Sequence, residues 1–409
     1  MQILPILSTL RRHKITASLI VLEIALTCAI VCNAVFLISQ RLQRMDMPSG
    51  VAMHELVQVQ VSTIGEQPDA KARTQEDLAA LRGIPGVQSV ALANELPFTN
   101  SSSNSSILLK PTQTQPTLNA TYYTGEDVAH VLGTRLVAGR WFRPDEYLDF
   151  EYVVTHQGDL PDSARIAIIT HAMAEKLWPG ENPLGKTFWM GNRIEMRVVG
   201  VVESLIRPSL WMGDNAAQWS MVFPLRMTVG QGASYVLRTA PQDRQRVIRA
   251  AVAALKKLDP KRVVTEHRTL DDARAEFFQG DRAMTGLLLG VIVALLLVTG
   301  LGIVGLASFW VGQRRRTIGV RRALGATRAD ILHYFQTENF LLATIGIVLG
   351  MVLAYGINLL LMLHYELPRM PWMYFPVGAL ALWLIGQIAV LGPALRASRV
   401  PPVVATRTV

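Results

Sequence analysis

Four long apolar runs limit what this chain can fold into. The runs cover residues 15–38, 283–311, 340–363 and 372–395, and among them only the first contains a charged residue. Each is longer than the ~20 residues that a helix needs to cross a bilayer. The runs therefore predict four transmembrane helices, over residues 15–39, 282–312, 335–364 and 372–395. About 240 residues separate the first helix from the second.

The first run is either a membrane anchor that stays in the protein or a signal peptide that is removed. It is too long for the apolar part of a signal peptide, and no small-x-small cleavage site follows it before Gln40-Arg41-Leu42. We expect an uncleaved membrane anchor, and the alternative is a removed signal.

The basic residues are distributed unevenly. Between Arg41 and Gly280, 26 basic and 26 acidic residues cancel, which leaves 14 of the 40 basic and 5 of the 31 acidic residues elsewhere. Twelve of those 14 form three patches: Arg11, Arg12 and Lys14; Arg314, Arg315, Arg316, Arg321, Arg322 and Arg328; and Arg396, Arg399 and Arg407. The patches alternate with the apolar runs as the positive-inside rule requires. The net charge of +9 is thus explained by membrane topology, and nucleic-acid binding is not needed to account for it.

This pattern predicts on which side of the membrane each segment lies. The expected cytoplasmic segments are residues 1–14, 313–334 and 396–409, and the expected external segments are residues 40–281 and 365–371.

One octapeptide, GENPLGKT over residues 180–187, fits the phosphate-loop pattern G-x-x-x-x-G-K-[ST]. A phosphate loop follows a buried strand and opens a helix, because the helix N-terminus holds the phosphates. Here a helical spacing precedes the octapeptide, and a β-rich segment with a turn at Gly191-Asn192 follows it. Pro183 also lacks an N–H group. We interpret the match as an external turn without nucleotide.

Two similar patterns bracket the large external segment. Strands are expected at residues 55–62 and 88–94, and again at 234–240 and 261–267, each pair joined by a helical segment. Two separated strand–helix–strand units predict a split ferredoxin-like subdomain, with a layer of helices on a sheet, so the fold class is an α+β membrane protein.

Helix starts support this assignment. Thr74 before Glu76 and Asp77 is expected to begin the first helix, and Pro241 with Asp243 the second. Residues from about 100 to 225 then form an insertion that we expect to be mainly β. Its polar run, residues 99–107, is expected to be a mobile loop.

Candidate chemical groups in the external segment are few. The carboxylate pairs Asp145-Glu146 and Asp271-Asp272 are expected to be solvated, because both fall in helix-start or loop contexts. The histidines lack metal-ligand spacing and no serine lies in a nucleophile elbow. Both cysteines, Cys28 and Cys32, fall within the first span and are expected to be packing residues. We expect a non-catalytic subunit without metal or cofactor.

The segment between the second and third spans, GQRRRTIGVRRALGATRADIL, combines six arginines with an apolar stripe. It predicts a short amphipathic helix at the membrane surface, with arginines at the level of the lipid phosphates. Purely topological arginines are the alternative. The ordered Ile318-Gly319 and Ala323-Leu324-Gly325-Ala326 elements favour docking of another subunit.

This segment resembles the signature of the FtsX/MacB-type permeases, the type VII group of the ABC superfamily. Further resemblances lie in LIVLEIALTCAIVCNAVFLIS, TGEDVAHVLGTRLVAGRWFRPDE, AIITHAMAEKLWPGENPLGKTF and GPALRASRVPPVVATR. They follow the family's order and cover nearly the whole chain.

The resemblance implies a permease half with four spans and a MacB-like periplasmic domain. In such a domain the ferredoxin-like part is a porter subdomain that carries an inserted subdomain. It implies a cytoplasmic ABC ATPase that binds ATP and magnesium, and a second permease subunit, identical or related. A periplasmic adaptor is a further implied partner. Because the first span begins near residue 15, we expect the ATPase to be a separate chain. The implied ATPase-coupling residues are Thr317, Ile318, Gly319, Arg321, Arg322, Ala323, Leu324, Gly325 and Ala326. Thr317 departs from the family, which commonly has Glu there.

Polar and small residues inside the spans are further candidates. Glu23 is a lone carboxyl within a span, which favours a functional role in the bundle interior, and a hydrogen bond across a dimer seam is the alternative. Gly286 with Gly290, and Gly346 with Gly350, are G-x-x-x-G pairs that permit close helix contact.

The resemblance also implies function and location. It implies a bacterial inner-membrane protein with both termini cytoplasmic, in which ATP hydrolysis drives movement of the periplasmic domain, a process termed mechanotransmission. We expect efflux or extraction of a peptide, antibiotic or lipid-linked molecule. The alternative is a signalling subunit that activates a periplasmic enzyme or senses a ligand.

Overall fold

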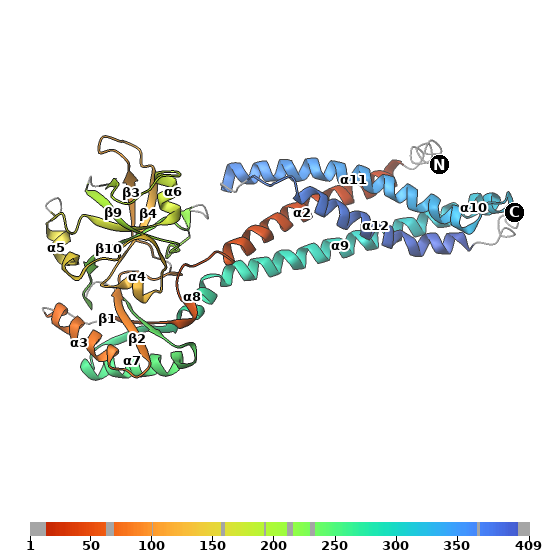
Figure 1. Cartoon of the computed structure of the whole chain (residues 1–409). Coiled ribbons are helices and arrows are strands. Elements are labelled where there is room, and N and C mark those ends of the chain that lie inside the picture. Colours follow the sequence, from red (N-terminus) through yellow and green to blue (C-terminus); the bar gives the residue numbers. More distant parts are fainter. Residues whose placement is uncertain are drawn as a thin grey trace. The chain divides into compact units, whose positions relative to one another are not determined.

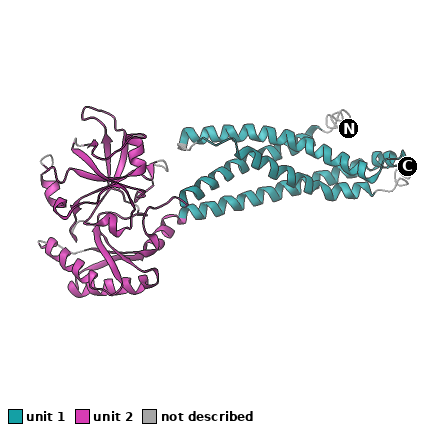
Figure 2. Cartoon of the chain, in the orientation of Figure 1, with its two compact units in different colours: residues 1–45, 280–409 teal, residues 46–279 magenta. Residues whose placement is uncertain are grey.

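The computed structural model of the chain describes residues 14–62, 69–99, 101–156, 160–191, 194–210, 216–229, 234–365 and 369–399. The chain divides into two compact units, one of residues 1–45 with 280–409 and the other of residues 46–279 (Figure 2). The first unit is helical, and the second combines helices with sheets (Figure 1).

The second unit contains the expected split ferredoxin-like subdomain. Its four strands are β1 (Leu56–Ser62), β2 (Val87–Ala93), β12 (Ser234–Thr239) and β13 (Val263–Thr269). They pair in the order β13-β1-β12-β2, and every pairing is antiparallel. The helices α3 (Ala70–Arg82) and α7 (Arg244–Leu258) each connect two of these strands (Figure 1). This order is the ferredoxin-like one, with the insertion between the second and third strands.

Alternation along β1 explains how this sheet is covered. Val57, Val59 and Val61 pack in one cluster with apolar residues of α3 and α7, so these helices cover the face that the valines occupy. Gln58 and Gln60 point to the opposite face, because successive strand residues alternate. Residues of α7 at helical spacing complete the core: Val247, Ile248, Ala251 and Leu255.

The start of α3 differs from the expectation. The helix begins at Ala70 rather than at Thr74, whose hydroxyl instead donates to Ala70 O (2.7 Å) and accepts from the Val229 N–H (2.9 Å). One turn further, Asp77 is fully buried. Its carboxylate accepts hydrogen bonds from Arg262 and Tyr235, at 2.5 Å each. Thr74 and Asp77 therefore bind neighbouring segments rather than cap the helix.

The insertion is mainly β, as expected. Its strands are β3 (Asn104–Leu108), β4 (Leu118–Thr124), β5 (Leu136–Gly139), β6 (Leu148–Asp149), β7 (Ile166–Thr170), β8 (Thr187–Met190), β9 (Glu195–Val202), β10 (Ser220–Phe223) and β11 (Leu225–Arg226). Seven of them pair in the order β5-β9-β7-β10-β4-β3-β8, and β8 pairs with β9 as well. Because of this last pairing, the six strands from β9 to β8 form a closed ring around an apolar core. β5 pairs with β9 and is not part of the ring. The short helices are α4 (Val128–Val131), α5 (Phe150–Thr155) and α6 (His171–Leu177).

The expectation of a mobile loop over residues 99–107 is wrong for its second half. Residues 104–108 form β3, between β4 and β8. The polar side chains find partners outside β3: Ser106 donates to Asn119 of β4 (2.9 Å), and Asn104 accepts from the buried Arg207 in the segment between β9 and β10. Residue 100 lies outside the described residues.

Within its described residues, the first unit has four helices long and apolar enough to cross a membrane: Lys14–Met45 in α2, Gln279–Gln313 in α9, Arg328–His364 in α11 and Tyr374–Ser398 in α12. A short helix, α10 (Arg315–Ala323), lies between α9 and α11. The short helix predicted between the second and third spans is thus present, and α11 begins at Arg328 rather than at residue 335. A capping box begins α11, because Thr327 Oγ1 accepts from Asp330 N (3.2 Å) and Asp330 accepts from Thr327 N (2.8 Å).

Candidate functional site in the membrane unit

The candidate coupling element is α10 and the turn that ends it. Its last turn carries Arg321 and Arg322, which suit the negative end of a helix dipole. Gly325 has a φ of +101°, a conformation that side chains rarely adopt, and its N–H bonds to Arg322 O. The turn leads directly to Thr327 and the capping box of α11.

Some of the expected coupling residues hold α10 onto its own unit. Ile318 and Gly319 are buried. The guanidinium carbon of Arg321 lies 4.7 Å from the centroid of the Tyr334 ring on α11. Arg322 donates to the backbone carbonyl of Ser398 at the end of α12. These contacts fix α10 against two of the long helices.

Other expected coupling residues face away from the unit. Thr317, Ala323, Leu324 and Gly325 are exposed, and Ala326 is half-buried. Leu324 is 83% exposed, and Val320, one helical turn earlier, is 48% exposed. An apolar pair at this spacing shares one face of a helix. Because arginines surround it, this exposed pair is suited to a protein partner.

An ion pair with a buried carboxylate is not among the contacts predicted from the sequence. Arg314, just before α10, donates to both carboxylate oxygens of Glu338 on α11 (3.0 and 2.9 Å). The two side chains are 13% and 2% exposed, and the Arg314 guanidinium lies over Trp310 (5.5 Å). One signal was available: Glu338 is one of only five acidic residues outside the segment from Arg41 to Gly280.

Glu23 lies at the contact between α2 and α9. A Cβ placed on Gly302 of α9 would approach the Glu23 carboxylate oxygens to 2.6 and 2.7 Å, so this carboxylate occupies the space that the glycine leaves. One turn along, Thr27 and Thr299 share a buried hydrogen bond of 2.8 Å. A polar seam thus joins these two helices within the unit.

The two glycine pairs have different surroundings. On α11, a Cβ at Gly346 would come within 2.8 Å of Ile24, and one at Gly350 within 2.5 Å of Cys28, both on α2. On α9, a Cβ at Gly286 or Gly290 would meet no atom of the described residues within 4 Å. Only the α11 pair therefore lies at a close helix contact within the described part of this chain. Both cysteines are buried at this packing, and Gly378 of α12 approaches Cys32.

The octapeptide at residues 180–187 has the predicted order of elements. It follows α6 and precedes β8, so no helix begins at it. Gly180 and Gly185 have φ of +69° and +79°, as tight turns require. Lys186 pairs with Glu181, and its Nζ lies 5.5 Å from the centroid of the Trp178 ring. Asn192 of the expected hairpin turn lies outside the described residues, but β8 and β9 pair as a hairpin.

We expect Lys186→Ala to leave ATP hydrolysis unchanged in the complex of this chain with the expected ABC ATPase. The free energy of unfolding of the external unit should fall by about 1 kcal/mol or less, because Lys186 makes only a surface ion pair and a ring contact. A malachite-green phosphate assay and a thermal melt of the variant check this. Loss of turnover would restore the phosphate-loop interpretation.

The carboxylate pairs are less solvated than expected. Glu146 is buried and accepts two hydrogen bonds from Arg140 (2.7 and 2.5 Å), which hold the pKa of its carboxyl below the usual range. The solvated interpretation is therefore wrong for Glu146, because Arg140 compensates its charge.

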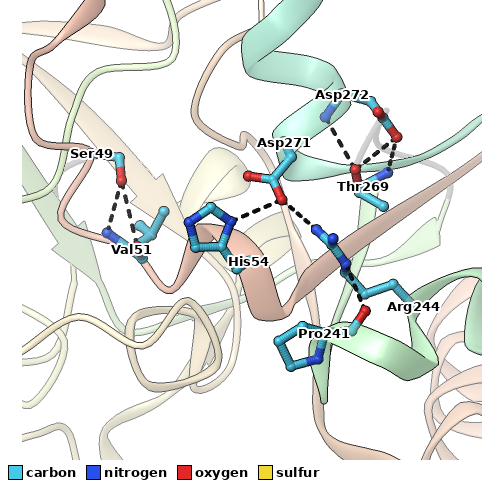
Figure 3. A network of polar contacts seen from close by, with 8 residues as sticks. All are labelled: Ser49, Val51, His54, Pro241, Arg244, Thr269, Asp271 and Asp272. Carbon is cyan, nitrogen blue, oxygen red and sulfur yellow. Dashed lines mark hydrogen bonds and ion pairs between the residues drawn. The ribbon is translucent and has the colours of Figure 1, made fainter.

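The second pair lies at the start of α8 (Leu270–Phe277) (Figure 3). Asp272 caps this helix together with Thr269. Asp271 accepts hydrogen bonds from His54 (3.0 Å) and from Arg244. Burial alone would raise the pKa of Asp271, but the bonds from His54 and Arg244 outweigh it and lower this pKa. Both carboxylates therefore position α8, the last element before α9.

The four candidate spans, the external α+β unit and the short basic helix between the second and third spans define a multi-pass membrane protein with a large extramembrane domain. Comparison with known proteins specifies it further. The MacB-like periplasmic core domain family matches residues 18–258, more than half of the chain, and the FtsX-like permease C-terminal family matches residues 289–402. The chain belongs to the FtsX/MacB-type permeases of ABC transporters.

Two relatives and one solved structure illustrate what the chain is similar to. The pyoverdine export ATP-binding/permease protein PvdT of Pseudomonas putida is 31% identical over 261 residues, covering 60% of this chain and 38% of the relative. The uncharacterized ABC transporter permease YknZ of Bacillus subtilis is 24% identical, covering 84% of this chain and 82% of the relative. Among solved structures, the periplasmic region of MacB from Actinobacillus actinomycetemcomitans aligns with a TM-score of 0.34 at 16% identity, covering 57% of this chain and 97% of that one.

Proposed function

We propose that this chain is the permease subunit of an exporter, and that it transmits ATP-driven movement from a separate cytoplasmic ABC ATPase to its periplasmic domain. The observation that carries the proposal is the arrangement of α10. Arg321 and Arg322 attach this helix to α11 and α12, while Val320 and Leu324 remain exposed. A helix that is held by its own unit and exposes an apolar pair among arginines is suited to receive force from a partner.

Covalent continuity supplies a route for that force. The Arg314–Glu338 ion pair ties the start of α10 to α11, and α10 follows α9 directly. At its other end, α9 begins at Gln279, where the periplasmic domain ends, and α2 ends at Met45, where that domain begins. Movement of α10 would therefore act on helices that are joined covalently to the periplasmic domain.

The proposal includes the orientation and the assembly. Both termini and α10 lie in the cytoplasm of a bacterial cell with the spans in its inner membrane, since arginine patches flank these segments. ATP and magnesium are bound by the ATPase. A second permease subunit, identical or related, completes the membrane part, and a periplasmic adaptor is a further candidate partner.

The proposed cargo is a peptide, an antibiotic or a lipid-linked molecule. The proposal is supported by the names of two relatives, which are a pyoverdine and a macrolide export protein. Those names concern the relatives and indicate only a class of cargo for this chain. The open α9 surface, including Gly286 and Gly290, is available for lipid or for the second permease subunit.

We expect Val320→Asp and Leu324→Asp each to reduce recovery of the ATPase with the tagged chain by about tenfold or more, because each places a carboxylate in an apolar contact. The measurement is affinity purification in mild detergent with quantitative mass spectrometry. Val137→Asp, at a valine with similar exposure (45%) in the periplasmic domain, is the matched control and should retain the ATPase. Equal recovery from the α10 variants and wild type would contradict this role of α10.

A further inference from the structure

A polar cavity of about 560 Å³ lies in the periplasmic domain. It lies against the four-stranded sheet β13-β1-β12-β2, on the face opposite the valines of β1. Its lining includes Gln58 and Gln60 of that strand. The segment after β2 and residues of α8 complete the wall. This volume is in the range of small-molecule sites. The sheet face that carries glutamines is therefore turned toward a cavity.

Two buried side chains in this wall each have an oxygen atom that accepts no hydrogen bond from the described residues. Gln58 is 2% exposed, and its Nε2 donates to Ser234 Oγ and Glu266 Oε2 (3.2 Å each). The neighbouring carboxylate fixes the amide orientation, because a flipped amide would place oxygen against oxygen. Within the described residues, Gln58 Oε1 accepts no hydrogen bond.

Glu95 is the second acceptor. It is 7% exposed, its Oε1 accepts from Ser103 (2.6 Å), and its Oε2 has no partner within the described ranges. Buried polar atoms are rarely left without a partner. Both unused atoms are acceptors, so a molecule that satisfies them must donate hydrogen bonds.

The charge of the cavity wall indicates which kind of hydrogen-bond donor fits it. Three carboxylates, Glu95, Glu266 and Glu276, line the cavity with one guanidinium, Arg268. That guanidinium pairs with Glu266 (2.9 Å) and Glu276 (2.6 Å). Glu95 forms no ion pair with any residue that the structure describes, and burial raises the pKa of its carboxyl. A bound cation would supply the missing positive charge.

Aromatic rings provide an apolar part of the same wall. Phe98 and Phe277 line the cavity and meet edge to face, with centroids 5.8 Å apart. Phe98 has a φ of +65°, a strained conformation for a bulky residue. Rings beside carboxylates are suited to an amine that has an apolar portion.

We propose that this cavity binds a small organic amine. Its ammonium group donates hydrogen bonds to Glu95 and Gln58, and its apolar portion packs against Phe98 and Phe277. An ammonium group has three donors, enough for both acceptors. Binding at this site does not depend on the ATPase or on transport, so the site can be tested without either.

The test is isothermal titration of the full-length chain in detergent with phenylalanyl-lysine amide, a water-soluble aromatic amine. Its diacetylated form is the matched neutral probe. We expect the amine to bind with a Kd of about 1 mM or tighter, and the acetylated form about tenfold more weakly or worse. No heat of binding with the amine, or equal binding of both probes, would overturn the proposal.

Variants locate the site. We expect Glu95→Gln to weaken amine binding about tenfold or more, since the charge is lost while the shape is kept. Glu203→Gln, at an exposed glutamate paired with Arg135 outside the cavity, should bind as wild type. Should Glu95→Gln not fold, Glu276→Gln at the exposed rim should still weaken binding about threefold. If Glu95→Gln folds and still binds the amine with wild-type affinity, the assignment is overturned. If only Glu276→Gln folds, wild-type affinity of that variant overturns it.

Discussion

Replacing Glu338 with alanine is expected to destabilise the membrane unit by about 3 kcal/mol, because it leaves the largely buried guanidinium of Arg314 (13% exposed) without a counter-charge. The junction between α9 and α10 would loosen, since Arg314 precedes α10 by one residue. Denaturant titration of the full chain in micelles measures the loss. ATP turnover by the complex should fall as well, because α10 would no longer move with α11.

Two further variants separate charge from packing. The double variant Arg314→Met with Glu338→Leu removes both charges and should recover stability to within about 1 kcal/mol of wild type. Glu203→Ala breaks the exposed pair with Arg135 and should leave the unfolding midpoint unchanged. An unchanged midpoint in Glu338→Ala would show that the Arg314–Glu338 pair does not hold the unit together.

Gly350→Leu is expected to cost the membrane unit about 3 kcal/mol or more. Its Cβ would fall 2.5 Å from Cys28 Cβ and 2.7 Å from the backbone oxygen of Ala25, so α2 and α11 would have to separate. The same titration in micelles measures the change, and yield from membranes should fall in parallel.

Gly290→Leu provides the matched control, with the same substitution in the same sequence pattern on α9. A Cβ at Gly290 meets no described atom within 4 Å, so the stability of the single chain should change by less than about 1 kcal/mol. If Gly290→Leu instead separates two permease copies in a cross-linking assay, the α9 face is a subunit interface. Equal destabilisation by both substitutions would contradict the packing described for α11.

Patterns confined to one segment predicted the fold well. The alternation in β1 and the repeated strand–helix–strand spacing predicted the ferredoxin-like sheet, and the length of the apolar runs predicted the long helices. Both signals lie within the residues that form each element. The polar run at residues 99–107 was misassigned for the opposite reason: β3 exists because β4 and β8 pair with it, and those strands lie elsewhere in the sequence.

Partners distant in sequence could not be predicted. Asp77 looks like an ordinary acidic residue near a helix start, and its burial depends on Arg262, 185 residues away. Likewise, Gly286 with Gly290 and Gly346 with Gly350 share one pattern, and only the packing of α2 distinguishes them. Glu95 and Gln58 lie on separate strands or loops, so the cavity between them has no sequence signature.

We expect ATP binding by the proposed partner ATPase to move the periplasmic domain through α10. Hydrogen–deuterium exchange of the assembled complex, nucleotide-free and trapped with ATP and vanadate, tests it most directly. We expect exchange in the segment over residues 46–279 to change on trapping in the wild type, and to stay constant in Leu324→Asp assembled at saturating ATPase. An ATPase that binds and hydrolyses ATP while exchange in residues 46–279 remains unchanged would show that α10 does not transmit movement to the periplasmic domain.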